Sequence, residues 1–245
     1  ADAVLGRAST ALTLYLRPTE AARVAPEWER LLLARANDAA LPYGMRKASL
    51  DALVATVRTE EGRAVLREYL AGRRQFDGKP VQQPTRWAMV GALAALGEPR
   101  PEAMIAAEAA RDSSAEGPRR AFVAGAAIPT AATRAEYFRR YLDDPKLNEE
   151  WATASLGAFN DPARPELSHP HLRASLDRLE WIRENRRIFF LPRWVNAFIG
   201  GQTTPEALAV VDRFLAENPR LPPDIRRKVL QARDELELTV RVRGG

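Results

Sequence analysis

"HLRASLDRLEWIRENRRIFFLPRWVNAFIGG", residues 171–201, decides the fold class of this chain. Its apolar side chains recur every three or four positions, at Leu172, Leu176, Leu179 and Ile182 and then at Phe190, Trp194 and Phe198. Side chains at these spacings share one face of an α-helix. We therefore expect two amphipathic helices here, whose aromatic residues form a packing stripe and not a ligand site.

Local signals mark the ends of these two helices. Pro192 suits the first turn of the second helix, where its missing N–H is no loss, and the Gly200–Gly201 pair can supply the left-handed residue that ends it. The basic run "IRENRR" ends the first helix, where cations meet the negative pole of the helix dipole. We expect its arginines to lie in water.

The same apolar period occurs upstream. "PYGMRKASLDALVATVRT", residues 42–59, and "EEGRAVLREYLAG", residues 60–72, each show one apolar stripe, and Gly72 is placed to end the second helix. "PTRWAMVGALAALG", residues 84–97, is apolar nearly all round, which predicts a central, buried helix. The chain therefore reads as helical from one end to the other.

Pro and Gly residues punctuate the chain at the lengths of ordinary globular helices. Breaks are expected near Pro26 and Pro170, whereas Pro101 and the Thr204–Pro205 pair indicate helix starts. About a dozen short antiparallel helices without strand-like alternation predict an all-α fold, an irregular α-solenoid in which helix pairs stack into a HEAT/armadillo-like superhelix. No strict period is present, so the sharply defined repeat families do not fit. We expect residues 1–245 to form a single helical domain.

The amino-acid composition of the chain excludes several classes of function. The chain of 245 residues has no cysteine, which removes disulfides, thiol nucleophiles and cysteine metal sites. Its net charge of +5 permits nucleic-acid binding, but the basic pairs are scattered among acids, and we expect no nucleic-acid partner. No stretch approaches the length of a membrane span, and the first residues lack a signal-peptide pattern, so a soluble protein without a membrane partner is expected. Its compartment, cytoplasmic or periplasmic, stays open.

Few residues of the sequence could form a catalytic or metal-binding site. The two histidines, His169 and His171, could share a metal only with a further ligand, and Ser168 resembles a helix cap that would leave both rings at an exposed helix start. A serine triad has no "GxSxG" elbow, phosphate-binding glycine loops are absent, and the many acid pairs are typical of helix surfaces. We therefore assign no catalytic, cofactor-binding or metal-ligating residue to this chain.

The last third of the chain carries a family resemblance. "NRRIFFLPRWVNAFIGGQTTPEALAVVDRFLAENPRLPPDIRRKVLQARDELELTVRVR", residues 185–243, resembles the end of the C-terminal helical domain of bacterial zinc aminopeptidases of the aminopeptidase N family. The order of an aromatic helix, the "TTPEA" turn, "FLAENP" and a final long helix carries the likeness. "GALAALGEPRPEAMIAAEAARD", residues 91–112, is similar to the middle of that domain, more loosely.

The resemblance implies one part of a larger enzyme that removes N-terminal residues from peptides. In that family a thermolysin-like domain carries "HExxH", a further Glu and a "GxMEN"-type loop, and the helical domain arches over it as a bowl that encloses the substrate cavity. None of these motifs occurs in this chain, so no zinc ligand or catalytic residue is carried over. The resemblance implies zinc in a missing catalytic domain, and that domain and peptide substrates as partners. The chain alone should be inactive.

Another class of function stays open. A free-standing α-solenoid scaffold would bind a protein or peptide along its concave face. The first helix, with "ALTLYL", and the last, with "LELTV", are rather apolar for the solvated caps of such a scaffold, which favours a missing neighbour.

Overall fold

The computed structural model describes residues 2–244, and the regular structure of this range is helical. It consists of fourteen α-helices and one short π-helix, and no strand occurs among the described residues. The one β-type feature there is the isolated bridge between Phe76 and Lys79, which closes a tight turn. The predicted all-α class is confirmed.

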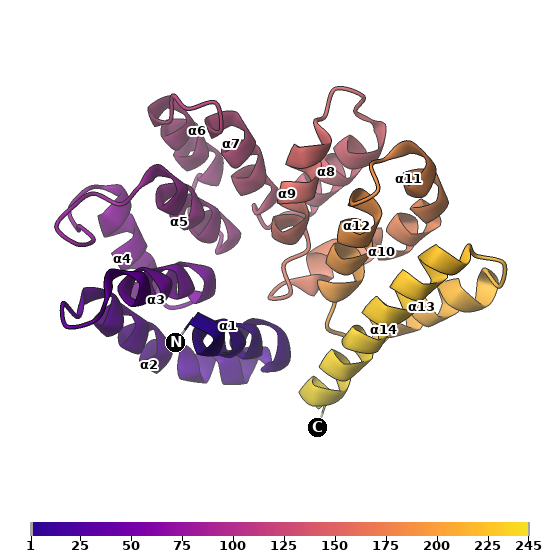
Figure 1. The fold of residues 1–245 in the computed structure, drawn as a ribbon, viewed down its shortest axis with the longest axis horizontal. Helices are drawn as coiled ribbons and strands as arrows, with labels where there is room; N and C mark the ends of the chain where they lie inside the picture. Colours follow the sequence, from indigo (N-terminus) through magenta and orange to yellow (C-terminus); the bar gives the residue numbers. More distant parts are fainter. Residues whose placement is uncertain (1, 245) are drawn as a thin grey trace. The chain divides into compact units, whose positions relative to one another are not determined.

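The helices group into two compact units, residues 1–128 and 129–245, which Figure 1 shows in indigo to magenta and in magenta to yellow. The prediction of a single domain over residues 1–245 stays a prediction.

The first unit is built around α5. Its elements are α1 (Asp2–Thr10), the π-helix η1 (Ala11–Tyr15), α2 (Pro18–Asn37), α3 (Tyr43–Thr56), α4 (Glu60–Leu70), α5 (Gln83–Ala95), α6 (Pro101–Arg111) and α7 (Gly117–Ala126). Helix α3 packs on α1, α2 and α5, and α5 in turn contacts α4, α6 and α7. Met89 and Leu93 of α5 are fully buried, so the prediction of a central, buried helix over this segment is confirmed.

The second unit is built around α12. Its elements are α8 (Ala131–Asp143), α9 (Glu149–Phe159), α10 (Pro165–Asp177), α11 (Leu179–Asn185), α12 (Phe190–Gly200), α13 (Pro205–Glu217) and α14 (Pro223–Gly244). Helix α12 contacts α9, α10, α11 and α14. Its stripe Phe190, Trp194 and Phe198 is buried, with Trp194 and Phe198 ring centroids 4.3 Å apart. The packing role predicted for this stripe is confirmed.

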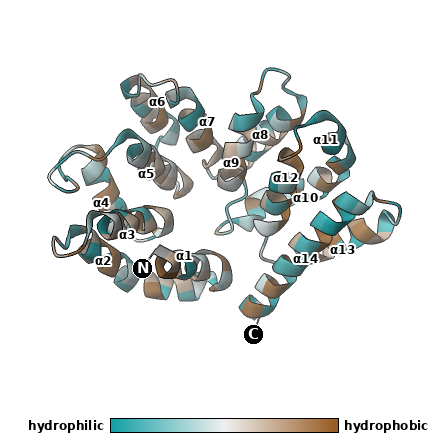
Figure 2. Cartoon of the chain, in the orientation of Figure 1, coloured by the Kyte–Doolittle hydropathy of each residue, from teal (hydrophilic) through white to brown (hydrophobic). Residues whose placement is uncertain are grey.

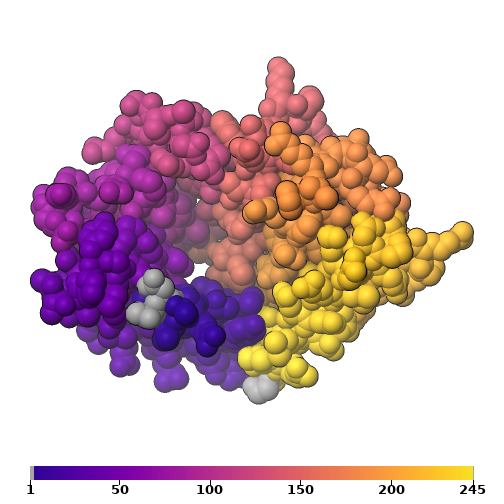
Figure 3. Space-filling model, in the orientation of Figure 1, coloured from indigo at the N-terminus to yellow at the C-terminus, as the bar shows by residue number. Residues whose placement is uncertain are grey.

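Hydropathy follows the helical period along most helices. Figure 2 shows brown and teal residues alternating along single helices, and within each unit the side chains fill the spaces between neighbouring ribbons (Figure 3). Within residues 2–244, no helix combines the length and the apolar character that crossing a bilayer requires.

Two expected breaks are wrong, because Pro26 lies inside α2 and Pro170 lies inside α10. A proline within a helix removes one backbone hydrogen bond and ordinarily kinks or ends the helix. Here burial on both sides of each proline outweighs that loss: α2 buries Ala25 and Leu32, and α10 buries Leu172. Tertiary packing therefore overrides the local signal.

The segment expected as one helix from His171 divides at Arg178, where α10 ends and α11 follows. Leu179 and Ile182 are buried as predicted, and α11 contacts both α10 and α12. The division at Arg178 therefore interrupts the helix but not its buried apolar stripe.

The glycines at the predicted helix ends behave differently from one another. Gly72 after α4 has φ of +74°, as expected of a helix-ending glycine. Gly201 has φ of −80°, so its predicted left-handed role is wrong. A Cβ there would overlap the backbone oxygen of Asn160, and the position requires glycine because α12 ends against the end of α9.

Helix starts follow their capping signals. Thr204 accepts a hydrogen bond from the Ala207 N–H at the start of α13, and Pro101 is the first residue of α6, as predicted. Arg100, which precedes α6, has a left-handed backbone with φ of +53°.

Candidate functional site

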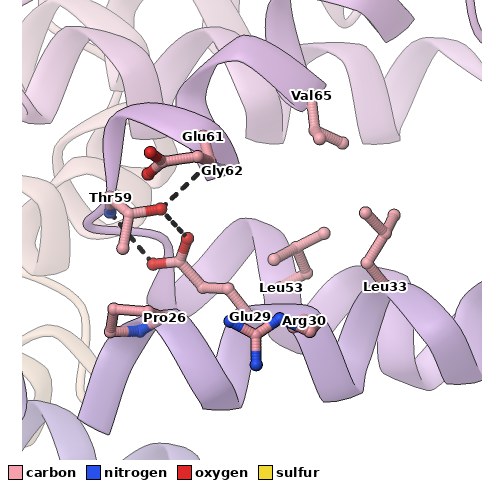
Figure 4. A pocket seen from close by; sticks show the side chains of 9 residues that line it. All are labelled: Pro26, Glu29, Arg30, Leu33, Leu53, Thr59, Glu61, Gly62 and Val65. Carbon is pink, nitrogen blue, oxygen red and sulfur yellow. Dashed lines mark hydrogen bonds between the residues drawn. The ribbon is translucent and has the colours of Figure 1, made fainter.

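A pocket of about 390 Å³ lies among α2, α3 and α4 in the first unit, and Figure 4 shows its lining. Glu29 projects from α2 toward the start of α4, while Leu33, Leu53 and Val65 form an apolar wall. Arg30 and Glu61 are exposed charged residues of the lining.

Glu29 is buried, and its carboxylate is held by hydrogen bonds to the segment before α4. Oε1 accepts from the backbone N–H groups of Arg58 (2.7 Å) and Thr59 (3.0 Å), and Oε2 accepts from the Thr59 hydroxyl. Thr59 Oγ1 in turn accepts from the Gly62 N–H, which caps α4. Glu29 therefore satisfies donors that would otherwise be buried without partners.

These contacts decide what Glu29 can do chemically. A general base needs a free lone pair directed at a substrate proton, whereas this carboxylate is fixed by three donors from its own chain. The Thr59 hydroxyl that donates to Glu29 Oε2 also accepts from the Gly62 N–H, so this hydroxyl is used to cap α4. The site is a structural junction between α2 and α4 with an apolar recess beside it.

A second buried carboxylate joins α5 to α6. Glu108 accepts from Arg86 through both oxygens, at 2.8 Å from Nε and 2.6 Å from Nη2, and Gln83 donates to it at 2.6 Å. Burial alone raises the pKa of Glu108, but the hydrogen bonds from Arg86 and Gln83 and the charge of Arg86 outweigh it and hold the pKa below its ordinary value. The pair is a bidentate ion pair inside the first unit.

The histidines lie deeper in a helix than predicted. Helix α10 begins at Pro165, so Ser168 is a buried residue within the helix and not its cap, and the Ser168 hydroxyl donates to the Pro165 carbonyl at 3.4 Å. The ring of His171 packs against Phe138 and Phe159, with centroids 4.7 and 5.7 Å away. The expectation of two exposed rings at a helix start is wrong because the helix starts earlier.

This placement also bears on metal binding. Residues separated by two positions on a helix point about 200° apart, so His169 and His171 do not converge on one ion. Burial and the nearby Arg134 lower the pKa of His171. Among the described residues no group of three or more His, Cys, Asp and Glu side chains is arranged to hold a metal, so the residues present do not fit a zinc ion.

The second unit has a groove of about 420 Å³ between α9 and the start of α12. Glu149, Glu150 and Thr153 line it from α9, and Arg187, Phe189 and Arg193 line it from the other side. The turn between α11 and α12 is fixed at two points: Glu149 accepts from the Arg187 N–H at 3.2 Å, and Arg186 donates to the Tyr141 carbonyl at 2.8 Å.

Arg186 departs from the expectation that the basic run lies in water. Its guanidinium lies 5.4 Å from the Trp181 ring and 5.5 Å from the Phe190 ring. These contacts and the bond to Tyr141 use the flat faces and the fork of the guanidinium for packing. Immediately beyond it, the Ile188 and Phe189 side chains are 80% and 74% exposed.

Comparison with known proteins identifies the family of this helical chain. Residues 2–238 match the family described as the ERAP1-like C-terminal domain. The chain belongs to this family. The predicted family relationship, which was carried most strongly by residues 185–243 and more loosely by residues 91–112, is thus confirmed over nearly the whole chain.

This chain is also similar to part of one known protein. Over 233 residues it is 29% identical to Aminopeptidase N from Streptomyces lividans. The match covers 94% of this chain and 27% of the length of that protein. The chain therefore corresponds to about a quarter of the relative.

Sequence reasoning missed Glu29 and the exposed Ile188–Phe189 pair. Glu29 gives no local signal, since its partners Arg58 and Thr59 lie 29 and 30 residues away. Phe189 did carry one: it falls off the four-residue spacing of Phe190, Trp194 and Phe198, and a residue outside an apolar stripe is free to face outward.

Proposed function

We propose that this chain is the non-catalytic C-terminal domain of a zinc-dependent aminopeptidase that removes N-terminal residues from peptides. In this role the domain encloses the substrate cavity and limits access to it. Its partners are the catalytic domain of the same polypeptide and the peptide substrate.

One observation carries the proposal: a C-terminal-domain family matches residues 2–238, and the chain aligns with only 27% of Aminopeptidase N. A non-catalytic role agrees with the engagement of the buried carboxylates. The buried carboxylates Glu29 and Glu108 are both engaged by donors of their own chain. Zinc is proposed for residues outside this chain, and no step of the reaction is assigned to residues within it.

The enclosing role rests on the predicted arrangement of helices. Neighbouring helices pack in chain order within each unit, for example α2 on α3 and α13 on α14, as in stacked helix pairs. We propose that the pairs form an irregular solenoid whose concave face borders the cavity. Such a wall excludes folded proteins by size and admits chain ends.

The first test is the coding sequence upstream of residue 1. An "HExxH" with a Glu about twenty residues later is the expected result, since a zinc aminopeptidase requires three protein ligands and a base. A start codon directly upstream would overturn the proposal in favour of a free-standing scaffold.

The second test measures access. The full-length enzyme and a variant lacking residues 1–245 are compared on peptides of 2 to about 15 residues with one N-terminal residue. We expect deletion to change the ratio of kcat/KM between short and long peptides by about tenfold or more, which corresponds to about 1.4 kcal/mol. Equal changes at every length, with the variant still folded, would contradict the access role.

A further inference from the structure

We infer that the turn bearing Ile188 and Phe189, with the adjoining groove between α9 and α12, is the surface through which this domain docks on the preceding part of its own polypeptide. The inference rests on the proposed function and adds to it the place of contact.

Exposure is the first observation. Ile188 and Phe189 are consecutive, and their side chains are 80% and 74% exposed, the largest fractions among the exposed large apolar residues of the described range. Scattered exposed apolar residues are ordinary, but adjacent large ones beside a groove are typical of an interface. Phenylalanine is enriched at the buried centres of such interfaces.

Rigidity is the second observation. Flanking residues anchor the turn: Phe190 is buried, the Arg187 N–H donates to Glu149, and Arg186 donates to the Tyr141 carbonyl. A mobile loop would lose backbone conformational entropy on docking, whereas the backbone of this turn is already held by the contacts on both sides of Ile188 and Phe189. Preorganised apolar anchors beside a groove are what hot spots of binding require.

Charge defines the partner surface. Glu150 lines one wall of the groove, and Arg187 and Arg193 line the other, so the groove carries both signs beside the Phe189 ring. None of these three side chains is ion-paired within the part of the chain that the structure describes. A complementary surface has an apolar recess for Ile188 and Phe189, an acid facing the arginines and a base facing Glu150.

The share of the related aminopeptidase that this chain covers indicates which partner binds the docking surface. The chain covers 27% of the aminopeptidase that it resembles, so most of a protein of that organisation lies outside the structure. A segment of the same polypeptide is present at high effective concentration, which favours it over a diffusing partner.

The test is site-specific photocrosslinking in the full-length protein. A benzoylphenylalanine replaces Phe189, and a matched variant carries it in place of Leu31, an exposed apolar residue of α2. After irradiation, mass spectrometry identifies the crosslinked peptides. We expect position 189, and not position 31, to crosslink to residues that precede this chain.

A second measurement avoids the bulky probe. Phe189→Ser replaces the exposed ring at the residue before α12 with a small polar side chain. In the full-length protein we expect it to lower the unfolding temperature of this domain by at least about 3 °C relative to Leu31→Ser, because only the former removes a docking contact.

Each outcome bears on the docking surface separately from the access role. Crosslinks from position 189 only within residues 1–245, or to a second copy in a concentration-dependent manner, overturn the inference, as does an unchanged unfolding temperature. If deletion of the domain alters length selectivity while position 189 stays uncrosslinked, the proposed function stands and the docking surface falls. If position 189 crosslinks to the preceding part of the polypeptide but deletion of the domain leaves length selectivity unaltered, the docking surface stands and the access role falls. A gene that encodes no aminopeptidase portion would overturn both the proposed function and the docking surface.

Discussion

The absence of a side chain at Gly62 allows α4 to pack closely against α2. This glycine lies in the first turn of α4, directly over the Glu29 carboxylate (Figure 4). A Cβ there would overlap Glu29 Oε2 and come within 2.6 Å of Val57 Cγ2. The clash involves a carboxylate that three hydrogen bonds hold in place, so the neighbour cannot simply move aside.

Gly62→Ala should therefore destabilise the chain although alanine is the better helix former. We expect a loss of about 1–3 kcal/mol in the free energy of unfolding, measured by urea denaturation. Gly91→Ala is the matched control, since a Cβ at Gly91 in α5 meets nothing within 4 Å and should stabilise the chain by about 0.5–1 kcal/mol. Equal effects at the two glycines would contradict the close packing of α4 on α2.

His171 gives a pH-dependent prediction at the same scale. Its pKa is lowered by burial and by Arg134, so protons bind the unfolded chain more readily than the folded one. Stability attributable to this residue is complete above the ordinary histidine pKa of about 6.5 and is lost as the pH falls from there through the lowered pKa of the folded chain. His171→Phe keeps an aromatic ring against Phe138 and removes the titration.

The wild type and His171→Phe should differ by a constant free energy of unfolding above about pH 7.5. Below about pH 6 the variant should become progressively more stable relative to the wild type. Denaturant titrations at four pH values measure this. Parallel pH profiles would mean that the imidazole stays as accessible to protons in the folded chain as in the unfolded one.

At the scale of elements, the Arg86–Glu108 pair fixes α5 to α6. Arg86 also donates to the Leu70 carbonyl at the end of α4 at 3.0 Å, so one guanidinium joins three helices. Both side chains are buried, and breaking a buried pair leaves an uncompensated charge.

Glu108→Gln should lower the free energy of unfolding by about 3 kcal/mol or more at pH 7. The pKa of Glu108 is depressed in the folded chain, so the wild-type advantage is complete above the ordinary glutamate pKa and is lost as the pH falls through the folded one. The gap between wild type and variant should narrow below about pH 4. Glu102→Gln, at an exposed position in the first turn of α6, is the control and should change stability by less than about 0.5 kcal/mol.

At the scale of the whole molecule, many of the arginines are engaged in ion pairs with neighbouring acids. Within the described residues, four arginines each contact at least two acids: Arg67 contacts Glu60 and Glu98, Arg140 contacts Glu136 and Asp144, Arg173 contacts Asp177 and Glu217, and Arg233 contacts Asp212, Asp234 and Glu237. Guanidinium groups engaged in this way are not gathered as a phosphate-binding face.

We accordingly expect binding to a 20-base-pair duplex to be weaker than about 10⁻⁴ M at 0.15 M salt, measured by fluorescence anisotropy. The net charge of +5 alone would give some association at low salt. Micromolar affinity with a steep salt dependence would contradict this prediction and revive a nucleic-acid role.

Much of the fold follows from local sequence pattern. The stripe of Phe190, Trp194 and Phe198, the cap at Thr204 and the helix start at Pro101 were all predictable, because helical period and capping depend on residues within one or two turns. Pro26 and Pro170 misled the prediction, because a proline signals a break locally while the burial that keeps its helix continuous comes from elsewhere in the chain.

The candidate sites were less predictable. Glu29 and Arg186 look like ordinary surface charges in the sequence. The residues with which they form hydrogen bonds lie 29 to 45 positions away. No local rule pairs groups at such separations. For the Ile188–Phe189 turn, the sequence gives the apolar residues but not their exposure, which depends on what packs against them.

The sequence by itself determined that this chain is helical, which faces of its helices are apolar and to which family it belongs, because these properties are written in short-range spacing and in residue order. Only the tertiary structure decided which charged groups are buried, which glycine is required by close packing and which apolar side chains are left outside. Those outcomes depend on the approach of helices distant in sequence, where burial and the satisfaction of polar groups outweigh local preference.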